Sequence, residues 1–469
     1  MAEKNPKTKK MKEKLFFEPS RVWDKLSKEE RVEAYAYAKG YIDFLNLSRT
    51  ERRAAKAFTN AAESRGFAEL AVNEKQARVF RSSRGKLVAM AVLGKKPLTE
   101  GLRLIVSHTD APRLDLKPSP LYEESSLAML KTHYYGGIKK YQWVARSLAL
   151  VGMVVLTDGR AVEVEIGLDP GDPIVTIPDL LPHLGRKQME KKASEFIPGE
   201  NLNLLVAGIP FEDKDTDNRV KLAFLNLLHE KYGIKEEDLT SAELQAVPAE
   251  PARDAGLDGC FVAGYGQDDR ISAYTSFTAL METQTPEHTA VVGFFDKEEI
   301  GSEGNTSAQS RFLEAFVMDL MEQAGIAPSS RRLTEVLMAS KALSADVNAA
   351  FDPNYADVFD KLNVCRLGYG VTVEKYTGSG GKYNASDASA EFASWLRKLF
   401  NDSGIVWQTG GHGKIDEGGG GTLAKFLART GMDIIDVGPA MLGMHSPLEI
   451  TSKEDVWMCH KAFKVFLNS

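Results

Sequence analysis

The sequence predicts an α/β fold in which a mostly parallel sheet is interrupted by an inserted β-rich domain. From Ala242 onward, predicted strands alternate with predicted helices, which is typical of a largely parallel sheet with helices on both faces. Between residues 121 and 242 the chain instead shows short β-like runs separated by glycine. At 469 residues it is too long for one ordinary core. We therefore predict a discontinuous domain of residues 1–120 and 243–469, with residues 121–242 inserted into it.

The first 120 residues supply helices and then strands. Ser27 and Glu30 form a capping-box pattern that predicts a helix over Arg31–Leu45, and a similar pattern at Ser48–Glu51 predicts a second helix that ends near Gly66. Apolar runs predict strands over Lys86–Leu93 and Leu102–Ser107.

Within the inserted region, Thr157–Arg160 has the composition of a hairpin turn between two strands, Met153–Leu156 and Ala161–Ile166. The amphipathic stretch Asn218–Tyr232 predicts a helix.

The last 227 residues or so carry the α/β alternation. A Thr451–Glu454 pattern predicts the cap of a final helix. The other predicted helices are Ile271–Glu282, Arg311–Ala324 and Ser389–Phe400, and the predicted strands are Thr289–Phe295, Lys341–Ala345, Ile405–Gln408 and Asp433–Val437.

Composition excludes several classes of protein. The chain is 43% hydrophobic and 26% charged, as expected of a globular protein in water, and its net charge of −6 argues against a nucleic-acid binder. No apolar run reaches the 18 residues of a membrane span, and the charged N-terminus does not resemble a secretory signal. Three cysteines form no disulfide framework. We expect a cytoplasmic protein without a membrane or nucleic-acid partner.

The stretch over residues 290–302 is the most informative one. The predicted strand Thr289–Phe295 is apolar, as expected of a buried strand, and runs directly into Asp296, Glu298 and Glu299. Carboxylates at the end of a buried strand are costly unless a positive charge lies among them. Adjacent glutamates also point in different directions, so one is able to hold a metal while the other handles the proton of a water molecule.

Four further pieces fit the same chemistry. His108 and Asp110 follow a strand, as do Asp346 and His445, and an aspartate pair at 268–269 precedes a predicted helix. Each piece alone is also typical of a structural histidine or a helix cap. Together, two histidines and several carboxylates at strand ends suit a pair of divalent cations that share one bridging carboxylate.

Four motifs give the chain a family resemblance: H-T-D-A-P from 108, F-F-D-K-E-E-I-G-S from 294, S-A-D from 344 and M-H-S-P-L-E from 444. In this order and separation they resemble the aspartyl aminopeptidase family of di-metal (zinc) exopeptidases, and within it the bacterial branch. The resemblance covers nearly the whole chain. It implies a zinc-peptidase catalytic domain and an inserted domain that makes dimer contacts.

The resemblance implies a role for each motif residue. His108 and Asp346 would complete one metal site, Glu299 and His445 the other, and Asp269 would bridge them. Glu298 would be the general base and Asp110 would orient His108. The metals implied are two divalent ions per subunit, zinc first, with manganese or cobalt as alternatives. The family pattern around the bridging aspartate differs from Gly266–Ile271 here, so Asp268 remains an alternative to Asp269.

The family removes N-terminal residues from peptides, with a preference for acidic ones, and assembles from dimers into a tetrahedral dodecamer. An acidic side chain needs a cation, for which Lys375, Lys382 and Lys414 are candidates. The list of possible substrate-binding residues is completed by Tyr383, His412 and His183, the last of which could reach a neighbouring subunit's site.

Two other functions remain open from sequence. A deacylase or carboxypeptidase would share the metal ligands and hold a substrate carboxylate in place of an amine. A self-assembling scaffold without activity is disfavoured, because the six residues proposed for catalysis and metal binding are all present.

Overall fold

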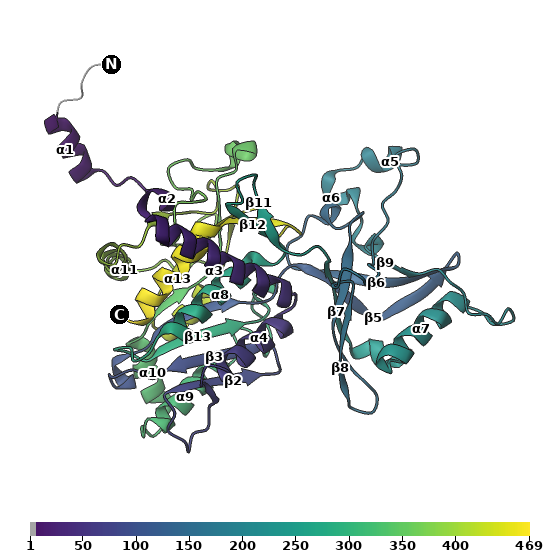
Figure 1. Cartoon of the computed structure of the whole chain (residues 1–469), viewed down its shortest axis with the longest axis horizontal. Coiled ribbons are helices and arrows are strands. Elements are labelled where there is room, and N and C mark those ends of the chain that lie inside the picture. Colours follow the sequence, from purple (N-terminus) through teal and green to yellow (C-terminus); the bar gives the residue numbers. More distant parts are fainter. Residues whose placement is uncertain (1–5) are drawn as a thin grey trace.

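The computed structural model describes residues 6–469 and shows two lobes (Figure 1). The larger lobe is built on a nine-stranded sheet, and the smaller on a six-stranded sheet formed by residues 113–248. No helix within the described range is long and apolar enough to cross a membrane.

The nine-stranded sheet has the order β1-β2-β3-β13-β4-β14-β20-β16-β18. Its four central strands, β13, β4, β14 and β20, are mutually parallel, so their carboxyl ends lie along one edge of the sheet. The predicted mostly parallel sheet is confirmed, although β3 and β16 are antiparallel to their neighbours β13 and β20. The strands are β1 (Ala68–Glu69), β2 (Arg78–Ser83), β3 (Leu87–Val92), β4 (Arg103–His108), β13 (Ala290–Phe295), β14 (Lys341–Ser344), β16 (Val371–Glu374), β18 (Trp407–Thr409) and β20 (Asp433–Gly438).

Helices cover both faces of this sheet, since its central strands are apolar on both sides. Along β13, Val292 and Phe294 join one core cluster while Val291 and Phe295 join the other. The first cluster takes side chains from α3 (Lys28–Leu47), α4 (Glu51–Glu63), α8 (Gln267–Glu282), α11 (Ala390–Asp402) and α13 (Lys453–Leu467). The second takes them from α9 (Phe312–Gln323), α10 (Ser330–Met338) and α12 (Ala424–Leu427). Two N-terminal helices, α1 (Pro6–Leu15) and α2 (Val22–Lys25), precede them.

The larger lobe also contains a five-stranded sheet of order β11-β12-β22-β21-β15. This sheet holds loops that lie next to the edge of the nine-stranded sheet. Gly264 on β12 pairs with Glu449 on β22. This pairing brings the segments that follow β12 and precede β22 together, although they are far apart in sequence. The strands are β11 (Arg253–Ala255), β12 (Phe261–Gly264), β15 (Asn348–Ala349), β21 (Ala440–Leu442) and β22 (Glu449–Ser452).

The smaller lobe extends past both predicted domain boundaries. Its antiparallel sheet, of order β8-β7-β10-β5-β6-β9, starts at Arg113 and ends at Pro248 rather than at 121 and 242. Only residues 109–112 separate β4 from β5, and only residues 249–252 separate β10 from β11, so no change of composition marks the crossing. The elements are β5 (Arg113–Glu124), β6 (Leu127–Tyr135), β7 (Leu148–Val155), β8 (Ala161–Ile166), α5 (Arg186–Met189), α6 (Ala193–Phe196), β9 (Leu204–Ala207), α7 (Arg219–Tyr232) and β10 (Glu243–Pro248).

Local sequence signals were right for most elements and wrong for two caps. The capping box of Ser27 and Glu30 is present at the start of α3, and the 157–160 hairpin joins β7 to β8. Thr50, not Ser48, caps α4, because the Ser48 hydroxyl donates to the Phe44 carbonyl of the preceding helix. Ser452 precedes α13 without a side-chain capping bond, and Thr451 belongs to β22.

Candidate metal centre

The candidate site lies where the central parallel strands end. Phe295 at the end of β13 pairs with His108 at the end of β4, and Asp346 follows β14 two residues after its last member. Parallel strands in register deliver the residues that follow them to the same edge. The sheet therefore brings the 108, 298–299 and 346 segments together, as the sequence predicted.

His108 is buried and its two ring nitrogens have different surroundings. Nδ1 lies 3.1 Å from the Asp110 carbonyl oxygen and 3.4 Å from Asp110 Oδ1. Nε2 lies 3.3 Å from Asp268 Oδ1 and 3.8 Å from Asp346 Oδ1. A proton on Nδ1 leaves the Nε2 lone pair directed at the carboxylates, which is the arrangement of a metal-ligating histidine.

His445 also faces Asp268, and it faces Glu299 as well. Its Nδ1 lies 3.0 Å from the Gly137 carbonyl oxygen of the smaller lobe, while Nε2 lies 3.3 Å from both Asp268 Oδ2 and Glu299 Oε2. One oxygen of Asp268 therefore faces His108 and the other faces His445. With a side chain 35% exposed, His445 is the most accessible of these residues.

The neighbouring aspartate is placed differently. Asp269 Oδ2 accepts a 3.4 Å hydrogen bond from the backbone N–H of His108. A carboxylate oxygen of Asp269 lies close enough to possible ligand atoms of His108 and Asp346, and of these two residues only, to share a metal ion with them. A second set of possible metal ligands consists of His108, Asp268 and Glu299. Both aspartates lie at the start of α8, where their backbone departs from helical geometry, and this turn directs the two side chains to different places.

Asp110 connects His108 to the acidic pair. Its carboxylate accepts hydrogen bonds from the backbone N–H groups of Glu298 and Glu299, both at 3.2 Å, and from the Tyr135 hydroxyl at 2.8 Å. Sequence reasoning missed Tyr135, which lies at the end of β6 in the smaller lobe and carries no motif signal.

Glu449 is a second residue that the sequence reasoning left without a role. It is buried and accepts hydrogen bonds from the backbone N–H groups of Gln267 at 2.7 Å, Asp268 at 3.2 Å and His445 at 2.8 Å. Its carboxylate thus fixes the two loops that carry Asp268 and His445. The signal was available, because Glu449 ends the M-H-S-P-L-E motif.

The pKa values reflect a buried excess of negative charge. Burial raises the pKa of Glu298 to about 8, with Asp346 and Asp110 adding to the rise against the effect of His108. Burial also raises the pKa of Glu299 well above its usual range. Burial lowers the pKa of His445, but Glu299 and Asp268 oppose it and bring the value to about 11.

These residues fit divalent cations. Asp268 Oδ1 and Glu299 Oε1 are buried and accept no hydrogen bond from the part of the chain that the structure describes. Six carboxylates surround the two histidines, so the histidines alone do not balance the charge, and buried unpaired charge is strongly unfavourable. Imidazole and carboxylate donors without a thiolate are typical ligands of zinc and similar ions.

A second group of candidate residues lines a cavity of about 410 Å³ next to this centre, which we call the lysine pocket. Lys375, Lys382, Lys414 and His412 are its cationic side chains. His412 Nδ1 lies 3.2 Å from Glu374 Oε1, and the charges of Asp346 and Asp268 also reach His412. The pocket therefore adjoins the metal centre.

Two predicted substrate residues lie outside these contacts. Tyr383 is 73% exposed, at the tip of the loop that follows β16. His183 is exposed in a turn before α5, which Figure 1 places on the smaller lobe, away from the nine-stranded sheet. Neither residue contacts the metal centre within the subunit.

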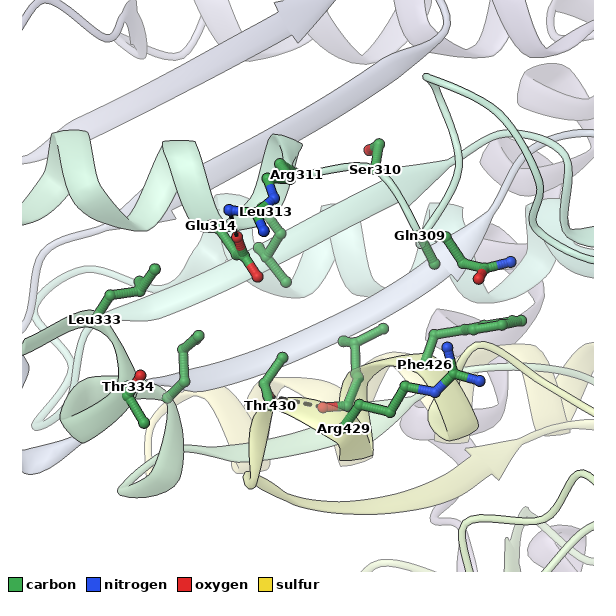
Figure 2. Close-up of a pocket in the computed structure, with 13 residues that line it drawn as sticks. Gln309, Ser310, Arg311, Leu313, Glu314, Leu333, Thr334, Phe426, Arg429 and Thr430 are labelled. Atoms are coloured by element: carbon green, nitrogen blue, oxygen red, sulfur yellow. Dashed lines mark hydrogen bonds and ion pairs between the residues drawn. The ribbon is translucent and has the colours of Figure 1, made fainter. Parts of the chain in front are cut away.

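A different cavity, of about 450 Å³, lies between α9, α10 and α12. Figure 2 shows Gln309 at one end of it, with Arg311 beside Glu314 and Arg429 beside Phe426. Gln309 Nε2 donates to the carbonyl oxygens of Gly301 at 3.3 Å and Ser302 at 3.2 Å. The cavity wall thereby supports the loop that carries Glu298 and Glu299.

The α/β fold and the carboxylate–histidine cluster at its sheet edge define the class of metal-dependent hydrolases. The chain matches the aminopeptidase I zinc metalloprotease (M18) family over residues 44–467. It therefore belongs to the M18 family of zinc aminopeptidases, which confirms the predicted family and enzyme class.

Similar proteins cover nearly the whole chain. A probable M18 family aminopeptidase 1 of Borreliella afzelii is 46% identical over 95% of this chain and 98% of its own length. The crystal structure of an M18 aminopeptidase from Thermotoga maritima is 44% identical, with a TM-score of 0.93 over 97% of this chain and 100% of that one. The fold also recurs in the S. cerevisiae mApe1 dodecamer, at 22% identity and a TM-score of 0.73 over 92% of this chain and 96% of that one.

Proposed function

We propose that this aminopeptidase uses two divalent metal ions to remove N-terminal residues, preferentially acidic ones, from peptides. The observation that carries the two-metal proposal is the position of Asp268, whose two carboxylate oxygens each lie 3.3 Å from a different histidine. Two cation sites that share one carboxylate need such a residue between them.

The donors divide into two sets. His108 and Asp346 belong to one site, and His445 and Glu299 to the other, as the family resemblance implies. We assign the bridge to Asp268 in place of the predicted Asp269, because Asp269 contacts only the His108 side. Zinc fits these donors, and manganese or cobalt would fit the same oxygen-rich set.

Bound divalent ions supply Lewis-acid activation of the peptide carbonyl and of the attacking water. The protein supplies the proton transfer. Glu298 Oε2 lies 3.9 Å from His108 Nε2, so its carboxylate borders the space between the donors. From there Glu298 would accept the proton of the attacking water and then donate it to the leaving amine. Asp110 holds His108 and the backbone of Glu298 in their relative positions.

The lysine pocket supports the acidic preference. Lys375, Lys382 and His412 line a cavity next to Asp346, where a substrate's first side chain would enter. Tyr383 borders the same loop and is a further candidate. Replacing Lys375 with alanine should reduce the preference for acidic over neutral N-terminal residues, and unchanged selectivity would count against its role.

We further propose self-association through the smaller lobe, to dimers and then a tetrahedral dodecamer. Exposed apolar side chains on this lobe, such as Leu184, Met189 and Ile209, support an interface there. Association would also be the route by which His183 reaches a neighbouring subunit's site. The free cysteines Cys260, Cys365 and Cys459 suit a reducing, cytoplasmic location.

The test is hydrolysis of aminoacyl p-nitroanilides of Asp, Glu, Leu and Lys, with N-acetylated controls, after chelation and addition of zinc, manganese or cobalt. Metal-dependent cleavage of free N-termini only, fastest for Asp and Glu and lost in Glu298→Gln, is the expected result. Cleavage of neutral residues alone would overturn the acidic preference. Release of the N-acetyl group would instead indicate a deacylase, and no activity with any metal a scaffold.

A further inference from the structure

One carboxylate pairs with both lysines of the loop that borders the lysine pocket. Asp387 Oδ1 lies 3.0 Å from Lys375 Nζ, and Asp387 Oδ2 lies 3.1 Å from Lys382 Nζ. The two lysines hold the pKa of Asp387 below its usual value. Each oxygen of this carboxylate therefore forms an ion pair with one ammonium group.

The loop geometry keeps Asp387 in this position. Ala388 donates its backbone N–H to the Lys375 carbonyl oxygen at 2.9 Å, which fixes the residue after Asp387 against the end of β16. Asp387 itself has φ of 47°, a left-handed conformation that aspartate and asparagine adopt more readily than most residues. The neighbouring Lys382 lies with Nζ 3.8 Å from the centre of the Tyr376 ring, which restricts where its ammonium group can go.

The other cations of the pocket also have internal acceptors. His412 pairs with Glu374, which is buried, and Lys414 donates to the Asp357 carbonyl oxygen. Asp387 offsets one of the two lysine charges that it contacts, and the carboxylate of Asp360, another lining residue, lies near enough to Lys414 for that charge to lower its pKa. The pocket is thus much less positive than its lysines and histidine suggest.

Packing contacts place this pocket beside the metal centre. Gly410 lines the pocket, and a Cβ atom there would lie 3.3 Å from Asn348 Oδ1. The Asn348 side chain donates to the Asp346 backbone carbonyl at 3.3 Å. One wall of the pocket is thus joined to the Asp346 segment, and under the proposed function the first side chain of a substrate enters this pocket.

We propose that Asp387 is a specificity-determining residue that competes with the substrate's acidic side chain for Lys375 and Lys382. This inference rests on the proposed function. An entering aspartate or glutamate must replace Asp387 at one or both lysines, whereas a neutral side chain needs no such exchange. Asp387 thereby moderates the preference for acidic residues.

The sharpest variant is Asp387→Asn, which removes the charge and retains a residue suited to the left-handed backbone. All three side chains are 45–49% exposed, so each ion pair is weak. We expect the ratio of kcat/KM for glutamyl over leucyl p-nitroanilide to rise about 3- to 10-fold. The increase should shrink at high salt, because screening weakens exposed pairs.

The matched control is Asp402→Asn, which removes an equal charge from an exposed pair with Lys398 on α11. Its ratio should match that of the wild type. A second measurement, calorimetric binding of free glutamate to the zinc-loaded proteins, should show the same 3- to 10-fold gain in Asp387→Asn, on the order of 1 kcal/mol.

An unchanged ratio and unchanged glutamate affinity in Asp387→Asn would overturn the inference while leaving the aminopeptidase proposal intact. A lower ratio would also overturn it, by showing that Asp387 positions the lysines for the substrate. If the wild type cleaves no substrate, the proposed function fails, and the glutamate titration still decides whether Asp387 competes for the lysines.

Discussion

The metal centre and the lysine pocket are neighbours with opposite designs. The metal centre gathers buried carboxylates at the ends of parallel strands, and its negative charge exceeds what its histidines balance. The lysine pocket lies on loops after β16 and β18, is partly exposed, and pairs most of its charges internally.

The difference separates two tasks. Chemistry needs donors held in fixed positions, which a hydrogen-bonded sheet provides, while selectivity is adjusted through loops that tolerate substitution. Changes in the metal centre should therefore abolish activity, and changes in the pocket should alter selectivity by small factors.

The largest expected effect separates the two aspartates of the metal centre. Asp268→Asn should lower zinc content and reduce kcat/KM on the order of 10³-fold, because it weakens the carboxylate that faces both histidines. Zinc per subunit by mass spectrometry and kcat/KM are the measurements.

Asp269→Asn is the matched comparison, with the same chemical change one residue away. It should retain more zinc and more activity than Asp268→Asn. The reverse ranking would return the bridging role to Asp269.

The next effect tests the support that the smaller lobe gives to the metal centre. Tyr135→Phe removes the hydroxyl that donates to Asp110 and should reduce activity about 10- to 100-fold, as is usual when a group that orients a metal ligand is lost. Kinetics with Tyr134→Phe, the adjacent exposed tyrosine, provide the control. Equal activities of the two variants would show that Asp110 needs no such support.

A pH effect on selectivity should arise in the pocket. Burial lowers the pKa of His412, but Glu374 opposes it and raises the value to about 9. His412 is therefore charged below that pH and neutral above it, so its contribution to acidic selectivity should be lost as pH rises through about 9.

Selectivity is measured as the ratio of kcat/KM for glutamyl and leucyl substrates, which cancels titration of the shared α-amine. We expect a fall of about 2- to 5-fold, absent in His412→Gln. A fall of equal size in that variant would assign the titration to another group.

The smallest effect concerns the cavity in Figure 2. Gln309→Ala removes two hydrogen bonds to the 301–302 backbone and should lower the free energy of unfolding by about 1 kcal/mol, with a few-fold loss of kcat. Thermal unfolding and kcat test this. A normal kcat would show that the loop with Glu298 needs no support from this wall.

The sequence by itself determined the α/β class, most helices and strands, and the positions of His108, Glu298, Glu299, Asp346 and His445 at strand ends. These features follow from local periodicity, and parallel strands bring their ends together without further information. The change of pattern over residues 121–242 also predicted an inserted domain, and the antiparallel sheet of the smaller lobe runs from Arg113 to Pro248.

Only the tertiary structure decided which aspartate stands between the histidines. Asp268 and Asp269 are chemically identical neighbours, and their difference arises from the turn at the start of α8 and from Glu449, which lies 181 residues from Asp268. Tyr135 and Asp387 were invisible for the same reason, since each acts through a contact that no local spacing encodes. Sequence pattern fixes which segments meet, and packing fixes which atoms of those segments face each other.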